Sequence, residues 1–531
     1  MEHYGVWGII PPVLTIILAF ATKDVLVSLF LGILSGTLIV AQGNPFVALM
    51  NLTDIISNSL ADGWNIRIFL FCGLLGGLVG LMSKTGAAGA FGKWASGKLK
   101  TTKGSQLMVF IFGLLIFIDD YFNSLTVGTV MRPISDKTKT SRAKLAYILD
   151  STAAPVCILA PISSWVVTVM SLARGAEGFD KLGISELQFF INSIPFNIYA
   201  ILTLIMVIYI SLSGRDFGPM AESEKLAKTG MLFNEEKYGV TSGDIVEIEV
   251  ERARPFDMLF PIIVLIASAV VFFPVTTWFL AVDGESITSF AQAVEQIPMG
   301  EAFNNTDASI ALMYAMIVTL FMTYIYYMLR RLVNLQSAGE ALRTGIASMI
   351  PALITLAMAW SIGTIIKSSP ADGGLGLGKF LSGVVINGGF PIIFIPAIVF
   401  ILSAVISFAT GTSWGTFGIM IPIVMPIATS LPGDNMANCV FICLAAVLSG
   451  AVFGDHASPI SDTTILSSTG ACCPHMEHVG TQIPYAAFIA VCSFIGFFVG
   501  GLSMNAVFAW IAALAAFVVG NIILPKVLKV K

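Results

Sequence analysis

Long apolar segments recur along the whole chain and constrain its fold more than any other feature. A helix rises 1.5 Å per residue, so about 20 apolar residues cross the ~30 Å hydrocarbon core of a bilayer. Segments near that length occupy residues 7–22, 25–41, 66–83, 189–212, 257–281, 308–328, 347–366, 484–503 and 505–524. Only 11% of the residues are charged, against roughly a quarter in soluble domains. The sequence therefore predicts an all-α polytopic membrane protein.

Several classes of protein are disfavoured by what the chain contains. A net charge of -4 provides no basic surplus for a nucleic-acid partner. The seven cysteines lie mostly within apolar segments, where thiols pack as small residues, so no disulfide framework is expected. The sequence contains no phosphate-binding lysine loop and no nucleophile elbow. We therefore expect neither an ATP-driven pump nor an enzyme, and no cofactor.

Two apolar regions, 107–172 and 390–469, are interrupted by polar residues. The first begins with an arm that ends at Asp119-Asp120, and this arm is too short to cross a bilayer. Lysines and arginines flank 107–131 on both sides, and short cytoplasmic loops gather such residues. A re-entrant hairpin would place both flanks inside. The charge pattern thus predicts about eleven crossings and two re-entrant hairpins, with the N-terminus outside and the C-terminus in the cytoplasm.

The chain also contains a weak internal repeat. Asn123-Ser124 followed by Met131-Arg132-Pro133 is matched by Thr412-Ser413 followed by Met420-Ile421-Pro422. The charge assignment gives the two copies opposite directions, as in the inverted repeats of many transporters. The predicted organisation is an extra helix (1–24), a first repeat (25–212; hairpin 107–131, broken helix 145–172), a cytoplasmic loop (213–256), a linking helix (257–281), a second repeat (308–503; hairpin 390–430, broken helix 436–469) and a C-terminal helix (505–531).

Breaks in membrane helices free backbone groups and are tolerated where they are buried or line a wet cavity. Four breaks are predicted, at 119–124, 150–155, 409–413 and 454–462, and inverted copies would bring them to the midplane. Their carboxylates and hydroxyls are suitable ligands for a hard cation. The candidate ion- or substrate-binding residues are Asp119, Asp120, Asn123, Ser124, Thr126, Asp150, Ser151, Thr152, Thr410, Thr412, Ser413, Asp455, His456, Ser458, Asp462 and Thr463; the candidate Na+ ligands are Asn123, Ser124, Asp150, Thr412, Ser413 and Asp455.

Simpler explanations exist for each of these groups. Asp119 and Asp120 could end an apolar run at the membrane interface, and Asp150 could cap the helix that follows it. Asp455 and Asp462 could lie in a surface loop. The string Cys472 to His478 matches no usual zinc spacing and is expected to be a cytoplasmic loop. The polar segment 213–256 is expected to be a solvated connector, with a regulatory element as the alternative.

The strings Phe453-Gly-Asp-His-Ala-Ser-Pro-Ile-Ser-Asp-Thr-Thr464, Asp119-Asp-Tyr-Phe-Asn-Ser124 and Leu149-Asp-Ser-Thr-Ala-Ala-Pro155 resemble the NhaC-type sodium/proton antiporter family of the ion transporter superfamily. The resemblance covers about residues 66–503. It implies a secondary transporter of the bacterial inner membrane, commonly a homodimer, in which a transport domain moves against a scaffold like an elevator. Some members resemble carriers of amino acids or carboxylates, so the resemblance indicates the mechanism better than the cargo.

Three functions remain open at this point: Na+/H+ antiport, Na+- or H+-coupled transport of an amino acid or related organic solute, and a channel or scaffold. The predicted breaks contain five aspartates and no lysine or arginine, which disfavours an anionic cargo unless bound Na+ supplies the counter-charge. An inverted repeat disfavours a simple channel because alternating access makes direct use of it. We therefore expect exchange of cytoplasmic Na+ for external H+, with the solute carrier as the alternative. The expected partners are the lipid bilayer and the transported ions.

Overall fold

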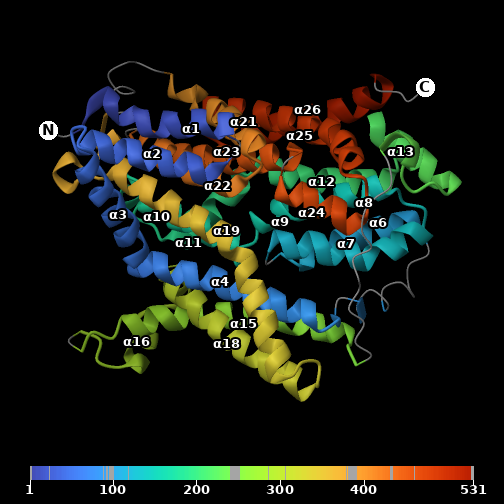
Figure 1. The fold of residues 1–531 in the computed structure, drawn as a ribbon, viewed down its shortest axis with the longest axis horizontal. Coiled ribbons are helices and arrows are strands. Elements are labelled where there is room, and N and C mark those ends of the chain that lie inside the picture. Colours follow the sequence, from blue (N-terminus) through green and yellow to red (C-terminus); the bar gives the residue numbers. More distant parts are fainter. Residues whose placement is uncertain are drawn as a thin grey trace.

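A computed structural model describes residues 3–22, 24–87, 89–90, 94, 101–117, 119–238, 252–284, 286–304, 306–377, 379–380, 391–430, 435–459 and 461–527. The regular elements of this part of the chain are all helices (Figure 1). Eight of the described helical segments are long and apolar enough to cross a membrane. They contain α4 (Gly63–Lys84), α12 (Ile198–Ser213), α15 (Pro255–Leu280), α18 (Ala308–Leu329), α19 (Leu335–Lys367), α23 (Asn435–Ala457), α25 (His475–Ser503) and α26 (Ala506–Val527). The predicted helical, multi-pass architecture is confirmed.

Several predicted spans differ from the helices that form. The first two correspond to η1 (Gly5–Ile9) with α1 (Ile10–Thr22), and to α2 (Val25–Val40), which are shorter than the long helices. The predicted span 189–212 divides into α11 (Glu186–Ser193), η3 (Ile194–Phe196) and α12, because Pro195 cannot donate to a continuous helical ladder. Helix α3 (Pro45–Ala61) was not predicted, since its polar residues interrupt any long apolar run; the side chain of Asn44 caps it.

Helices α4 and α19 pack against each other in opposite directions at very short range (Figure 1). Gly76 and Gly80, one helical turn apart on α4, face Gly345 and Ala341 on α19. A Cβ atom at Gly345 would lie 2.0 Å from the carbonyl oxygen of Gly76. Small residues at such spacing let the backbones of membrane helices approach closely. Helices α15 and α18 pack beside this pair.

We expect Gly345→Ala to destabilise the fold, because the added methyl group collides with the backbone of α4. Overpacking of this kind costs roughly 1–3 kcal/mol. The matched control is Gly339→Ala on the same helix, where a Cβ meets nothing within 4 Å. That change should leave stability unaltered or raise it by up to about 1 kcal/mol, because alanine is the better helix former. Thermal unfolding in detergent measures both. A similar shift in the two variants would contradict the close approach of α4 and α19.

The remaining helices form two pairs that are each followed by a broken helix. Helices α6 (Thr102–Leu115) and α7 (Asp120–Lys137) lie side by side, and Thr102 Oγ1 donates to the Thr138 carbonyl oxygen at 2.7 Å. Helices α8 (Arg142–Thr152), α9 (Ala154–Cys157) and α10 (Ser164–Gly175) follow. In the second half, η5 (Ile392–Phe394), α21 (Ile395–Thr410) and α22 (Ser413–Ala428) precede α23 and α24 (Asp462–Ala471).

These two sets of helices interlock. Helix α24 packs against α7, where the Gly128 position meets the backbone of Gly470, and α22 packs against α10. Within the second set, α23 packs against α21 through Gly450 and Gly454. Along the chain, a pair of helices followed by a broken helix occurs twice, first as α6–α7 with α8–α10 and then as α21–α22 with α23–α24. Short helices complete the described structure: η2 (Phe179–Leu182), α13 (Gly218–Thr229), α14 (Glu235–Tyr238), α16 (Phe290–Gln296), α17 (Met299–Asn304) and η4 (Pro370–Asp372).

The first part of the polar loop 213–256 is not a free connector. Asp216 forms an ion pair with Lys144, whose side chain is fully buried, and the ring of Phe217 stacks on Tyr485 at 4.2 Å between centroids. Glu224 on α13 accepts hydrogen bonds from the backbone and hydroxyl of Ser141. The expectation of a solvated linker is therefore wrong for these residues, because specific polar partners on α8 and α25 hold them. Residues 239–251 lie outside the described part.

Candidate functional site

The four predicted breaks fall where helices end in the described structure, with one displaced by a few residues. Helix α8 ends at Thr152, α21 and α22 are separated by Gly411 and Thr412, and α23 ends at Ala457 before α24 begins at Asp462. Gly411 has φ +69°, a left-handed conformation that glycine adopts without strain. The first break lies between Leu115 and Asp120, so Asn123 and Ser124 are helical residues in the first turns of α7.

Asp455 is a buried residue near the end of α23. Its carboxylate accepts hydrogen bonds from residues at the starts of α22 and α24. Its Oδ2 atom accepts hydrogen bonds from the backbone N–H of Ser413 at 3.1 Å and from the Ser413 hydroxyl at 2.7 Å. Its Oδ1 atom accepts from the hydroxyl of Ser461 at 2.5 Å. Asp455 is 3% exposed, and no ion pair joins it to a cationic side chain in the described part of the chain. A surface-loop position is therefore excluded for this aspartate.

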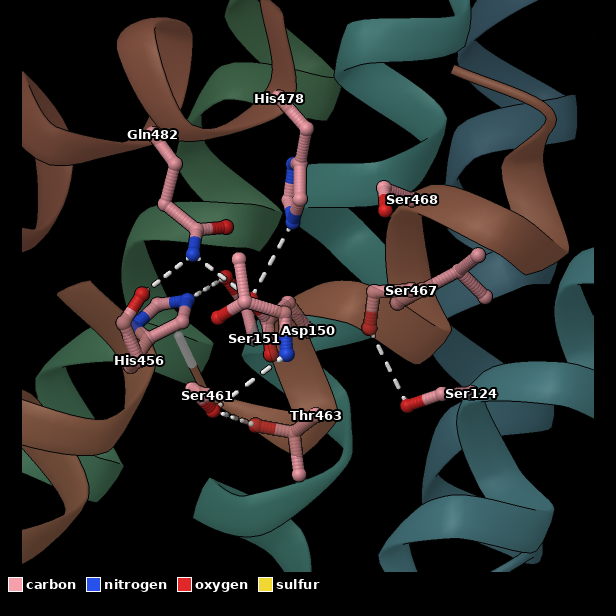
Figure 2. A network of polar contacts seen from close by, with 12 residues as sticks. Ser124, Asp150, Ser151, His456, Ser461, Thr463, Ser467, Ser468, His478 and Gln482 are labelled. Atoms are coloured by element: carbon pink, nitrogen blue, oxygen red, sulfur yellow. Dashed lines mark hydrogen bonds and ion pairs between the residues drawn. The ribbon is translucent and has the colours of Figure 1, made fainter. Parts of the chain in front are cut away.

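Asp150 has a different set of partners, of which Figure 2 labels Gln482 and His478. Its Oδ2 atom accepts from Gln482 Nε2 at 2.6 Å and lies 3.2 Å from His478 Nε2. The same oxygen also accepts from Thr464 Oγ1 at 3.0 Å. Its Oδ1 atom is buried without a hydrogen-bond partner among the described residues. The carboxylate lies in the last turn of α8, so its role as a cap for the following helix is not observed.

The two carboxylates are joined through the first turn of α24. Ser461, the N-cap of α24, donates to Asp455, and Thr464 in the same turn donates to Asp150. Next to them, Ser151 Oγ lies 3.2 Å from His456 Nε2, and the other ring nitrogen of His456 lies 2.8 Å from the Tyr199 hydroxyl. Asp150 and Asp455 come from different halves of the chain. The fold nevertheless brings them into one buried polar cluster, because Ser461 and Thr464 of the same helical turn contact one carboxylate each.

The start of α7 adds a third set of polar groups. The Asn123 side-chain amide donates to the carbonyl oxygens of Gly113, Ile116 and Thr152 at 2.8–3.0 Å, while its Oδ1 atom has no partner among the described residues. The hydroxyl of Ser467 donates to Ser124 at 3.1 Å (Figure 2). Asp119 and Asp120 are both buried, so neither is an exposed interfacial residue in this structure.

The other predicted residues lie near the breaks but face different partners. Thr152 and Thr410 donate to carbonyl oxygens of their own helices, and the Ser458 hydroxyl donates to the carbonyl oxygen of Phe408. Thr463 lies 2.9 Å from the Ser461 hydroxyl. Thr126 and Thr412 are half-buried. Asp462 begins α24, and its side chain lies outside the described ones.

Sequence reasoning missed three partners of this cluster: His478, Gln482 and Tyr199. The segment that begins at His475 is the start of α25, not a loop, and its polar first turns point toward Asp150 instead of into solvent. The signal that was available is the spacing of His478 and Gln482, which places them one turn apart on the same face of a helix. Gln482 also donates to the carbonyl oxygen of His456, which ties α25 to the end of α23.

The groups of this cluster are chemically suited to a proton or a small cation. Buried hydroxyls can donate to a bare carboxylate, or can turn and offer a lone pair to a metal ion. Unpartnered acceptor oxygens on Asp120, Asn123, Asp150 and Gln482 add further ligand capacity among the described residues. Buried carboxylates beside broken helices, in an all-helical membrane protein, are the arrangement expected of a secondary transporter.

The chain belongs to the Na+/H+ antiporter family, whose family model matches residues 156–502. The resemblance noted from its motifs is thereby confirmed. A relative from Haemophilus influenzae, described as an uncharacterized protein, is 37% identical over 523 residues, which cover 97% of this chain and 94% of the relative.

A second relative matches over a shorter segment. It is the malate-2H(+)/Na(+)-lactate antiporter of Bacillus subtilis, 34% identical over 120 residues, which are 22% of this chain and 24% of that protein. Among solved structures, the chain is similar to MtrF of Neisseria gonorrhoeae, described as representing a class of antimetabolite efflux pumps. The TM-score is 0.51 at 13% identity, with 87% of this chain and 85% of that chain covered. This likeness concerns the fold alone.

Proposed function

We propose that this transporter exchanges cytoplasmic Na+ for external H+ at the buried cluster around Asp150 and Asp455. The observation that carries the proposal is the environment of Asp455, whose two oxygens accept only from hydroxyls and one backbone N–H among the described residues. An ionised carboxylate inside a membrane protein needs a compensating charge or must be protonated. Na+ and H+ are then alternative occupants of the same site, and this exclusion is the physical basis of exchange.

The proposed cycle follows from that competition. When the site faces outward, Asp455 and Asp150 take up protons and Na+ leaves. After the site turns inward, the lower cytoplasmic proton concentration removes the protons, and Na+ binds with oxygen ligands from Ser413, Ser124 and Asn123. The net result is that Na+ leaves the cell and H+ enters it.

The finer topology is part of the same proposal. We place α6–α7 and α21–α22 as re-entrant hairpins of an inverted repeat, with the N-terminus outside, the C-terminus inside and about eleven crossings. The supporting observations are the basic flanks of the first hairpin and the recurrence of the same helices in the same order. A homodimer in a bacterial inner membrane, with an elevator movement of the site-bearing helices, completes the proposal.

The decisive experiment is flux in proteoliposomes that contain the purified full-length protein, with a pH-sensitive dye and 22Na+. We expect an imposed Na+ gradient to drive proton movement without any added solute, and 22Na+ to move in the opposite direction. Protein-free vesicles are the control. If protons move only after an amino acid or a carboxylate is added, the Na+/H+ exchange proposal is wrong.

A second candidate function is Na+- or H+-coupled transport of an organic solute. It is favoured by the relative whose name includes malate and lactate, although that match covers only a fifth of this chain. Such a cargo would need donors for its carboxylates, and the cluster around Asp455 offers serine hydroxyls and one backbone N–H. The same proteoliposomes, tested with a panel of amino acids and carboxylates, distinguish this candidate from simple exchange.

A further inference from the structure

A cavity of about 390 Å³ lies at one end of α4 and α19, away from the carboxylate cluster. We call it the seam cavity, because α3, α4 and α19 line one side while α10 and α22 line the other. Its volume falls within the roughly 300–1,000 Å³ that is typical of pockets for small molecules. The lining residues used below are Ser59, Asp62, Trp64, Asn65, Ser171, Arg174, Trp360, Thr364 and Lys367.

Two cationic side chains stand at the rim of the seam cavity. Arg174 donates from Nη1 to Glu186 at 2.8 Å, and its guanidinium lies over the ring of Trp64 at 4.4 Å. This arrangement fixes the plane of the guanidinium and leaves its other N–H groups without a hydrogen bond to described residues. Lys367 is exposed and makes no hydrogen bond or ion pair within the described part of the chain. Arg174 and Lys367 therefore keep N–H groups that can donate to an anionic group of a ligand.

The floor of the seam cavity is polar and is held by contacts between the two sides. Ser171 on α10 accepts from the indole N–H of Trp360 at 2.9 Å and donates to Asn65 at 3.2 Å. The hydroxyls of Ser59 and Thr364 lie 3.3 Å apart. Trp64 and Trp360 are almost fully buried, so their indole rings form rigid walls. Rigid aromatic walls with a few fixed polar groups are characteristic of pockets that bind small organic molecules.

Asp62 carries the one carboxylate among the described residues that line the cavity, and only one of its two oxygens accepts hydrogen bonds. Oδ1 of Asp62 accepts from the backbone N–H groups of Trp64 and Asn65 and so caps α4. The other oxygen makes no hydrogen bond to described residues and can accept from an ammonium group. Asp62, like Arg174 and Lys367, is exposed at the cavity. Cationic donors and a free carboxylate oxygen along one cavity match the two charges of an amino acid, while the cationic donors alone match a simple carboxylate.

We propose that the seam cavity binds a small organic molecule that carries a carboxylate. Arg174 and Lys367 bind the carboxylate, the indoles of Trp64 and Trp360 contact the carbon skeleton, and Asp62 receives an amine where the molecule has one. Charge-assisted contacts to guanidinium and ammonium groups are the usual means of carboxylate recognition in proteins. The site is separate from the Asp150 and Asp455 cluster and does not depend on Na+/H+ exchange.

The test is equilibrium binding to the purified full-length protein in nanodiscs, with succinate, L-aspartate and the uncharged succinamide as probes. We expect saturable binding of succinate or L-aspartate, or of both, and none of succinamide. Lys367→Gln should weaken the binding roughly tenfold or more, which corresponds to about 1.4 kcal/mol, and Lys367→Arg should restore it. If L-aspartate binds more tightly than succinate, Asp62→Asn should remove the difference.

Two control variants keep the result interpretable. Lys181→Gln removes a positive charge from the same end of the molecule but outside the cavity lining, and it should leave binding unchanged. Asp455→Asn alters the proposed ion site and should also leave binding unchanged. The proposal is overturned if neither succinate nor L-aspartate shows saturable binding. Unaltered binding in both Lys367→Gln and Arg174→Gln would overturn it as well, as would loss of binding in Asp455→Asn.

Discussion

Replacement of Asp455 by asparagine is expected to reduce Na+-driven proton flux to the level of protein-free vesicles. Asparagine has nearly the same shape and can still accept from Ser413 and Ser461, so the hydrogen bonds that hold α22 and α24 are kept in part. It cannot carry a negative charge or take up a proton in this pH range. The two alternative occupants of the site are therefore both lost. Measurement of 22Na+ and proton flux in the same proteoliposomes tests this expectation.

The matched control for this experiment is Asp180→Asn, which removes an exposed carboxylate on η2, outside the four breaks. We expect wild-type flux in that variant. Unfolding temperature in detergent should be similar for Asp455→Asn and the wild type, which separates loss of function from loss of fold. Wild-type exchange in the Asp455 variant would remove this residue from the mechanism.

The positions of the breaks could be predicted from the sequence because the residues that interrupt the helices can be recognised in it. Polar strings inside apolar regions, together with Gly411, mark where a helix cannot continue. It also identified Asp150, Asp455, Ser413 and Ser124 as members of buried polar contacts, although the residues lie in distant parts of the chain. Distant breaks could be grouped because the repeat suggested that equivalent positions meet.

Other parts of the site were beyond sequence reasoning for a physical reason. A search for long apolar segments finds only the parts of helices that lack polar residues. It therefore finds α25 from residue 484 onward and misses its first turns, where polar residues face the protein interior. Helix α3 was missed because polar residues, most of them exposed, interrupt its apolar run. The direction in which a polar face points depends on neighbouring helices, and only the packing of α25 on α8 and α23 brings His478 to Asp150.

Removal of the His478 side chain is the second change with a large expected effect. In His478→Ala, Asp150 keeps donors from Thr464 and Gln482 but loses the imidazole, which lies 3.2 Å from its Oδ2 atom. Hydrogen bonds to charged groups contribute about 1.5–3 kcal/mol. Loss of this contact destabilises the ionised form of Asp150 by a similar amount. The KM for Na+ should therefore rise roughly ten- to a hundredfold at fixed pH. The relevant measurement is 22Na+ flux as a function of Na+ concentration at two pH values.

The pH dependence separates an ionic role of His478 from a structural one. Na+ binds the ionised carboxylate in the proposed exchange, so a higher pH removes the competing protons and should restore much of the apparent Na+ affinity of His478→Ala. His478→Gln retains a neutral N–H donor and should lie between the alanine variant and the wild type. His475→Gln, three residues earlier on α25, changes a histidine that contacts Ser468 and the carbonyl oxygen of Pro459 instead of Asp150, and its KM should stay near the wild-type value. An unchanged KM in His478→Ala at both pH values would show that the imidazole does not support the charge of Asp150, and ion binding would then have to depend on Asp455 and its serine partners.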